Sequence, residues 1–211
     1  MKYVVLIGDL KSSRKIAERA KVQEKLKRTL KYVNEYCADS IAAKFRIVSG
    51  DSFQGMLSSP ESIFDVYYAL FEKIGHPFYL GIGIGGISTN LSEDIAEIDG
   101  EAFHMASEAL AGAKKEIRWI ELRSNWKDND LIACLMNFAA DMMWGWTKRQ
   151  KEVIGHFVLC GRDGKGVKPL SAALGVSERS IYKTLNAGNY RLWKYGKDAL
   201  EKALSQKRFK D

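Results

Sequence analysis

Two short apolar runs in the first quarter of the chain each lead into a glycine–aspartate pair. Residues 4–7 precede Gly8 and Asp9, and residues 45–48 lead through Ser49 to Gly50 and Asp51. The β-branched residues of both runs predict strands that end at a carboxylate. Two carboxylates at one sheet edge would hold Mg²⁺ or Mn²⁺ against phosphate groups, because these ions bind carboxylate and phosphate oxygens. The alternative is that both pairs are ordinary turn residues.

Apolar periodicity over the first 122 residues predicts alternating strands and helices. The expected strands are residues 3–8, 42–48, 52–57, 77–86 and 117–122, and the expected helices are residues 14–36, a helix opened by Pro60 with Ser59 as its cap, and residues 100–115. The order β-α-β-β-α-β-α-β predicts an α+β fold, a ferredoxin-like sheet domain extended by one helix and one strand. In such a sheet the first strand neighbours the hairpin, which would bring Asp9 and Asp51 together.

Glycines alternate along the fourth expected strand at Gly81, Gly83 and Gly85. A strand face without side chains allows a ligand or another backbone to approach closely. It serves equally well for tight packing of a helix on the sheet, and both interpretations remain open.

The charge of the chain is concentrated in its C-terminal part. The net charge of 211 residues is +7; residues 1–130 hold 18 Lys and Arg against 19 Asp and Glu, and residues 131–211 hold 15 against 7. An excess of this kind predicts contact with nucleic acid, with a solvated basic surface as the alternative. A second basic stretch, residues 11–31, carries nine basic residues and two acidic ones.

Composition argues against several classes of protein. No apolar segment is long enough to cross a bilayer, and Met1 leads directly into a strand, so we expect a cytoplasmic protein without a membrane partner. The three cysteines, Cys37, Cys134 and Cys160, are not at metal-ligand spacing, which argues against a zinc site or a disulfide framework.

Residues 169–185 have the pattern of a helix-turn-helix unit. Thr147 is expected to cap a helix to about Cys160, a short helix follows over residues 168–174, and Gly175 allows the turn before a helix over 178–186 that Ser177 caps. The pattern predicts that the second helix enters the major groove of double-stranded DNA. The expected DNA-binding residues are Lys168, Ser177, Arg179, Ser180, Tyr182, Lys183, Asn186 and Arg191. Basic three-helix units also serve as protein-interaction modules, which is the alternative.

The expected domains are residues 1–124, the sheet domain, and residues 147–211, a small all-α DNA-binding domain with a final helix over 197–211. Between them, residues 125–146 are expected to form a connecting amphipathic helix, since apolar residues recur there at spacings of three and four.

Four motifs of residues 1–122 together resemble the class III nucleotide cyclase domain, in order and in spacing. They are Gly8-Asp9-Leu10, Ser49-Gly50-Asp51-Ser52-Phe53, Gly81-Ile82-Gly83-Ile84-Gly85 and Asp99-Gly100-Glu101-Ala102-Phe103-His104-Met105-Ala106-Ser107. The whole chain is similar to the SatD family, in which such a domain precedes a small helical domain. The resemblance to cyclases implies that Asp9 and Asp51 hold two metal ions against a triphosphate.

Two positions depart from the cyclase pattern. The cyclase helix carries an asparagine and, four positions later, an arginine that orient the ribose and stabilise charge in the transition state, whereas this chain has His104 and Glu108 there. A carboxylate is electrostatically unsuited to that task. If catalysis occurs, His104 is the candidate general base, and a partly buried helix residue without such a role is the alternative. Candidate nucleotide contacts are Lys11, Arg14, Lys15, Gly50 and Gly83.

These observations lead to three hypotheses. The first is a DNA-binding regulator of transcription of the SatD type whose cyclase-like domain binds a metal–nucleotide or related phosphate ligand. The second is a metal-dependent nucleotidyl cyclase or nucleotide-joining enzyme. The third is a non-catalytic dimeric scaffold; cyclase domains of class III work as dimers, so the resemblance implies a homodimer.

Overall fold

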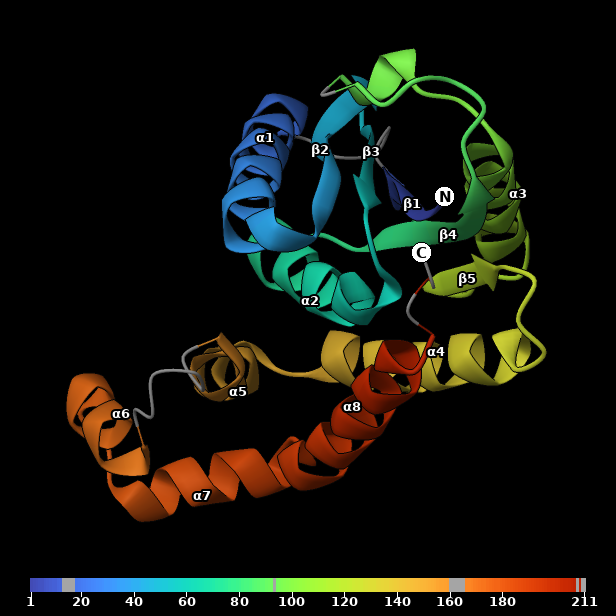
Figure 1. The fold of residues 1–211 in the computed structure, drawn as a ribbon. Coiled ribbons are helices and arrows are strands. Elements are labelled where there is room, and N and C mark those ends of the chain that lie inside the picture. The colour runs from blue at the N-terminus through green and yellow to red at the C-terminus, as the bar shows by residue number, and fades with distance from the viewer. Residues whose placement is uncertain (13–17, 93, 160–165, 208, 210–211) are drawn as a thin grey trace. The chain divides into compact units, whose positions relative to one another are not determined.

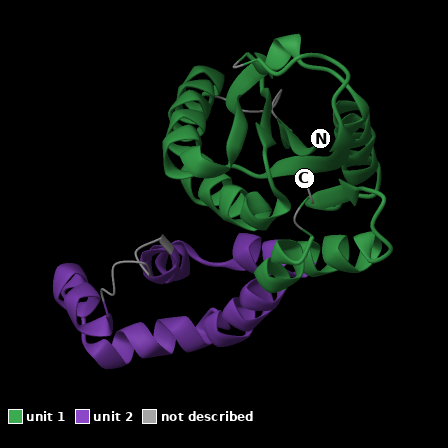
Figure 2. Cartoon of the chain, viewed as in Figure 1, with its two compact units in different colours: residues 1–137, 200–211 green, residues 138–199 purple. Residues whose placement is uncertain are grey.

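The structure is a computed structural model of residues 1–211 and describes all of them except 13–17, 93, 160–165, 208 and 210–211 (Figure 1). The chain divides into two compact units (Figure 2). Unit 1 comprises residues 1–137 and 200–211, and unit 2 comprises residues 138–199. In the part of the chain that the structure describes, no helix has the length and apolarity needed to span a membrane.

Unit 1 is built on a five-stranded mixed sheet. Its strands are β1 (Lys2–Leu10), β2 (Ile41–Ser49), β3 (Ser52–Leu57), β4 (Phe78–Gly86) and β5 (Ile120–Arg123), in the order β2-β3-β1-β4-β5. Neighbouring strands are antiparallel except for the parallel pair β4 and β5. The α-helices of the unit are α1 (Arg19–Tyr36), α2 (Ile63–Ile74), α3 (Glu101–Lys115), the first half of α4 (Asn129–Gly145) and the end of α8 (Tyr190–Ser205). The predicted order of strands and helices is therefore confirmed.

Helices cover both faces of this sheet. On one face Val5 is in register with Met56 and Gly83, and this face packs against Ala102 and Ala106 of α3. On the other face, the ring of Phe78 lies 6.0 Å from Phe53 and 5.4 Å from Tyr67 of α2. Successive side chains along a strand point to opposite faces, so each strand residue lies either on the α3 side or on the α2 side of the sheet.

Two local predictions in unit 1 are wrong. The strand expected from Ile117 begins at Ile120, because Ile117 has a left-handed φ of 55° and ends α3 with a bond from Arg118 N to Ala113 O. Ser59 makes no side-chain cap; Pro60–Ser62 forms the 3-10 turn η3 directly before α2. In both places the backbone at a helix end adopts a structure that the sequence pattern did not predict.

The compact units also end elsewhere than the expected domains. Asn129 donates to Leu122 O at 2.6 Å, and Asn137 donates to Ile120 O at 2.7 Å while accepting from the backbone of residues 119 and 120. These bonds join the first half of α4 to β5, so the connecting segment expected over 125–146 does not stand apart. Lys207 bonds to Asp128 at 2.6 Å, which likewise joins the end of the chain to unit 1.

All described elements of unit 2 are helices. They are the second half of α4, α5 (Lys148–Leu159), α6 (Val167–Leu174), α7 (Glu178–Ala187) and the first part of α8 (Tyr190–Ser205). The indole N–H of Trp193 donates to Ala139 O, that of Trp146 donates to Gly188 O, and the two rings meet edge-on at 5.2 Å. The final helix begins at Tyr190, earlier than expected, because Asn189 at φ 51° separates it from α7.

Candidate functional site

Asp9 lies at the end of β1, on the α3 side of the sheet. It is in register with Ser52 of β3, whose hydroxyl donates to Asp9 Oδ1 at 2.5 Å. Lys114, in the last turn of α3, places Nζ 2.5 Å from Oδ2. The side chain of Asp9 is 18% exposed. Both oxygens of Asp9 are thus bound, one by a hydroxyl and one by a cation.

Asp51 lies in the turn between β2 and β3. Its backbone carbonyl accepts from Leu10 N at 3.4 Å, so the chain segments that carry Asp9 and Asp51 are neighbours. Its carboxylate lies 4.0 Å from Nη2 of Arg19, on α1. Asp51 also lines a small cavity together with Leu10 and with Leu26 of α1, so it lies on the side of the sheet that α1 covers. The two aspartates therefore share a sheet edge but contact different helices.

The donor atoms at this edge fit a hard divalent cation. Carboxylate oxygens are the protein ligands that Mg²⁺ and Mn²⁺ prefer, and such ions commonly take the rest of their coordination from water and phosphate. Among the described residues no group of three or more His, Cys, Asp and Glu side chains could hold a metal ion. A cation bound by both Asp9 and Asp51 would need one side chain to rotate away from its present partner and would depend on phosphate oxygens.

Lys11 follows β1 directly and packs against two aromatic rings. Its Nζ lies 3.5 Å from the ring centroid of Trp119 and 4.2 Å from that of Tyr79. Tyr79 is in register with Asp9 on the α3 side of the sheet. Cation–π contacts of this kind hold an ammonium group in place. The ammonium group thus lies beside the Asp9 edge. Arg14 and Lys15, the other expected phosphate contacts, lie outside the described residues.

The two glycines expected to contact a nucleotide have different surroundings. Gly50 has a φ of 57° in the hairpin turn, where L side chains are disfavoured, and its carbonyl accepts from Gln23. Gly83 is buried, and a Cβ there would lie 2.1 Å from Ala102 O. The glycine face of β4 is therefore occupied by α3, as the packing interpretation expects.

His104 is exposed on the first turn of α3, with Nε2 3.9 Å from Asp99 Oδ1. Lys114, which contacts Asp9, lies ten residues further along the same helix, about 15 Å at 1.5 Å per residue. Glu108 is paired with Arg123 of β5 at 2.8 Å. Within one chain, His104 is thus well separated from the Asp9 edge.

The turn between α6 and α7 in unit 2 has well-defined caps. Gly175 is left-handed at φ 62°, and the bonds from Gly175 N to Ala172 O and from Val176 N to Ser171 O close the end of α6. Ser177 accepts from Ser180 N and caps α7. The expected helix limits differ from those observed by one residue at most. Thr147 likewise caps α5, where its hydroxyl accepts from Gln150 N.

Helix α7 has one buried side and one exposed side. Ile181 and Leu185 are buried, and the exposed residues Arg179, Tyr182, Lys183 and Asn186 recur at spacings of three and four. We call these four residues the α7 stripe. Arg179 and Lys183 form no ion pair within the described part of the chain.

The remaining expected DNA contacts lie around this stripe in the same unit. Lys168 on α6 and Arg191 at the start of α8 are exposed, Ser177 is the exposed cap of α7, and Ser180 is half-buried. Unit 2 as a whole has 11 Lys and Arg residues against 5 Asp and Glu residues. The stripe therefore lies in a unit with a clear positive excess.

The sequence profile of the SatD family matches residues 3–203, nearly the whole chain. The chain belongs to the SatD family. A search of curated proteins finds no match to it.

Solved structures similar to this SatD-family protein include two nucleotide cyclases. A bacterial light-regulated adenylyl cyclase is 9% identical, with 57% of this chain and 73% of the other covered at a TM-score of 0.43. The catalytic core of a rhodopsin-guanylyl cyclase with converted specificity is 14% identical, with 52% and 71% covered at 0.37. A regulator of polyketide synthase expression from Bifidobacterium adolescentis is 11% identical, with 100% and 87% covered at 0.27. At these TM-scores the similarities carry no conclusion about activity.

Four residues near Asp9 in the SatD-family protein were not expected from the sequence. They are Ser52, Tyr79, Lys114 and Trp119. Ser52 follows Asp51 within the hairpin motif, so its position was a usable signal. Lys114 and Trp119 lie more than 100 residues from Asp9, and only the packing of α3 and β5 on the sheet brings them there.

Proposed function

We propose that this SatD-family protein is a DNA-binding regulator whose sheet unit binds a metal–nucleotide or related phosphate ligand. The observation that supports DNA binding most directly is the α7 stripe, which combines a guanidinium, an ammonium, an amide and a phenol on one exposed side of a well-capped helix. Arginine, lysine and asparagine are the side chains that read base edges in the major groove.

In this proposal the surrounding cations set affinity. Lys168 and Arg191 would contact phosphates, which gives binding that weakens as salt rises without selecting a sequence. Arg179 and Lys183 would contact both phosphates and bases, because they lie on the first turns of the helix that enters the groove. Buried Ile181 and Leu185 would hold the helix in position.

The test is binding of labelled duplex DNA by the full chain, measured by fluorescence anisotropy at several salt concentrations. Arg179→Ala combined with Lys183→Ala should weaken binding about tenfold or more and reduce the salt dependence by about two phosphate contacts. The control is Lys115→Ala with Lys202→Ala, which removes the same charge from exposed sites on α3 and α8. Equal affinities for both double variants would contradict the proposal.

For the sheet unit, we propose that Asp9 and Asp51 bind Mg²⁺ or Mn²⁺ together with the phosphates of a nucleotide. What supports this is the position of two carboxylates on adjacent chain segments, joined by the bond from Leu10 N to Asp51 O. Lys11, Arg14 and Lys15 would supply positive charge to the phosphates, and Gly50 would let them approach the hairpin backbone. The metal would neutralise phosphate charge.

A second candidate function, a metal-dependent enzyme that cyclises or joins nucleotides, is favoured by the same pair of carboxylates. His104 as general base would have to come from a second copy of the chain, because it is about 15 Å along α3 from the residue that contacts Asp9. The test is incubation with each ribonucleoside triphosphate and Mg²⁺ or Mn²⁺, with products identified by mass spectrometry. A product that Asp51→Asn abolishes would establish the enzyme; nucleotide binding without product would support the regulator.

A further inference from the structure

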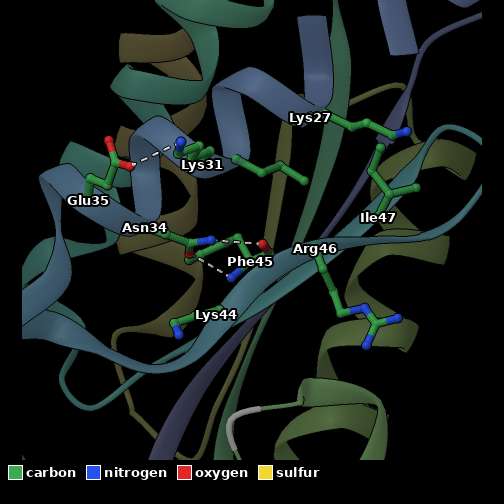
Figure 3. A pocket seen from close by; sticks show the side chains of 9 residues that line it. Lys27, Lys31, Asn34, Glu35, Lys44, Phe45, Arg46 and Ile47 are labelled. Atoms are coloured by element: carbon green, nitrogen blue, oxygen red, sulfur yellow. Dashed lines mark hydrogen bonds and ion pairs between the residues drawn. The ribbon is translucent and has the colours of Figure 1, made fainter. Parts of the chain in front are cut away.

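A groove of about 530 Å³ lies between α1 and the edge strand β2 of unit 1 (Figure 3). Its apolar lining comes from Leu30 of α1 and from Phe45 and Ile47 of β2. It includes neither Asp9 nor Asp51, so it is separate from the candidate metal–nucleotide site. A volume of this size suits a small organic molecule.

Positive side chains line the groove from both elements. Lys27 and Lys31 project from α1, and Lys44 and Arg46 come from β2, where Arg46 turns toward Asp94; Glu35 is the acidic residue among the described ones that line the groove (Figure 3). Arg46 is paired with Asp94, so four cations stand against two carboxylates, Glu35 and Asp94, which leaves an excess of positive charge.

Two of these cations on α1 are weakly engaged. Lys27 has no ion pair within the described residues, and Lys31 lies 3.9 Å from Glu35 in a pair whose side chains are 80% and 67% exposed. Exposed pairs of this kind contribute little, since water and salt screen them. Arg46 is bonded to Asp94. Lys27 and Lys31 are therefore free to turn toward a negatively charged group in the groove.

Asn34 restricts what can bind there. Its amide donates to Phe45 O at 3.0 Å and accepts from Phe45 N at 2.7 Å, so both backbone groups of the residue at the centre of the groove are already bonded. An added strand would need those groups. The groove thus offers an apolar surface and cations, with the backbone of Phe45 closed to pairing.

We propose that this groove binds a small organic carboxylate with an apolar body, of the size of a medium-chain fatty acid. The apolar body would lie against Ile47, the partly exposed apolar residue of the lining, and the carboxylate would lie between Lys27 and Lys31, where charge-assisted hydrogen bonds are strongest. The ligand needs both parts, because the groove combines an apolar lining with an excess of positive charge.

The test is isothermal titration of the full chain with decanoate, decanol and inorganic phosphate. Decanoate should bind, and decanol, which lacks the charge, and phosphate, which lacks the tail, should each bind about tenfold more weakly or worse. Phosphate binding as tightly as decanoate would overturn the proposal and leave a simple anion site. No heat change with decanoate below its micelle concentration would overturn it as well.

Two double variants locate the site. Lys27→Glu with Lys31→Glu should weaken decanoate about tenfold or more, and Lys21→Glu with Arg28→Glu, on the same helix but outside the groove, should leave the affinity within about twofold. All four residues are exposed, so both variants should keep the fold, which circular dichroism checks. Equal weakening by the two variants would place the ligand elsewhere and overturn the proposal.

Discussion

Nζ of Lys114 lies 2.5 Å from Oδ2 of Asp9, which joins the end of α3 to the end of β1. An ammonium group at this distance compensates the carboxylate charge that a divalent cation would otherwise neutralise. Lysine and metal therefore compete for the same oxygen. If Asp9 is a metal ligand, Lys114 sets how tightly the ion binds.

We predict that Lys114→Ala binds Mn²⁺ more tightly than the unmodified protein, by about tenfold, because the carboxylate no longer has a competing cation. Mn²⁺ binding is measured by electron paramagnetic resonance with and without a nucleoside triphosphate. Lys115→Ala is the matched control, since that neighbouring lysine is exposed and does not contact Asp9. Asp9→Asn in the Lys114→Ala background should remove the gain. Unchanged Mn²⁺ affinity in Lys114→Ala would exclude Asp9 as a ligand.

Gly83→Ala should destabilise unit 1 by roughly 1–3 kcal/mol or more. A Cβ at Gly83 would lie 2.1 Å from Ala102 O and 2.3 Å from Ala106 N, so α3 would have to move away from β4. Gly112→Ala, on α3 itself, is the control, because its Cβ would meet only the side chain of Glu121, at 3.6 Å. That change should stabilise the helix by about 0.5–1 kcal/mol. Urea unfolding followed by circular dichroism measures both, and equal stabilities would show that the α3 contact adapts easily.

Asn34→Ala should destabilise the protein by about 1–3 kcal/mol and promote association. The change leaves Phe45 N–H and C=O without their partners on an edge strand, where unpaired backbone groups are open to another chain. Thermal unfolding gives the stability and light scattering gives the association. Asn90→Ala, at an exposed position of the chain, should change neither. A monomeric Asn34→Ala protein of unchanged stability would mean that water satisfies Phe45 equally well.

The sequence predicts the order of strands and helices in unit 1 because each element has its own periodicity and its own stop signal. It also predicts the end of α6 and the start of α7, since Gly175 and Ser177 act within a few residues of their own position. The contact of Lys114 with Asp9 depends on where α3 packs across the sheet, which no local pattern contains. The glycine face of β4 could have admitted a ligand or a closely packed helix, and only the packing of α3 on Gly83 decides between the two.

The bond between Asp128 and Lys207 predicts a pH-dependent contribution to the stability of unit 1. The hydrogen bond from Lys207 holds the pKa of the Asp128 carboxyl below its ordinary value. A carboxyl whose pKa is lowered by folding stabilises the folded state above the pKa of the unfolded chain, about 3.9, and this contribution disappears as pH falls through the lower folded value.

Asp128→Asn should therefore have a lower Tm than the unmodified protein at about pH 6, and the difference should be smaller at about pH 2, because the contribution is lost as the carboxyl becomes protonated in the folded state. The side chains of Lys207 and Asp128 are 26% and 38% exposed, so we expect a difference of a few degrees at most that shrinks in high salt. Asp130→Asn, two residues away and exposed, should show no such change with pH. A Tm difference for Asp128→Asn that is the same at both pH values would mean that lost packing, and not the charge of Asp128, causes it.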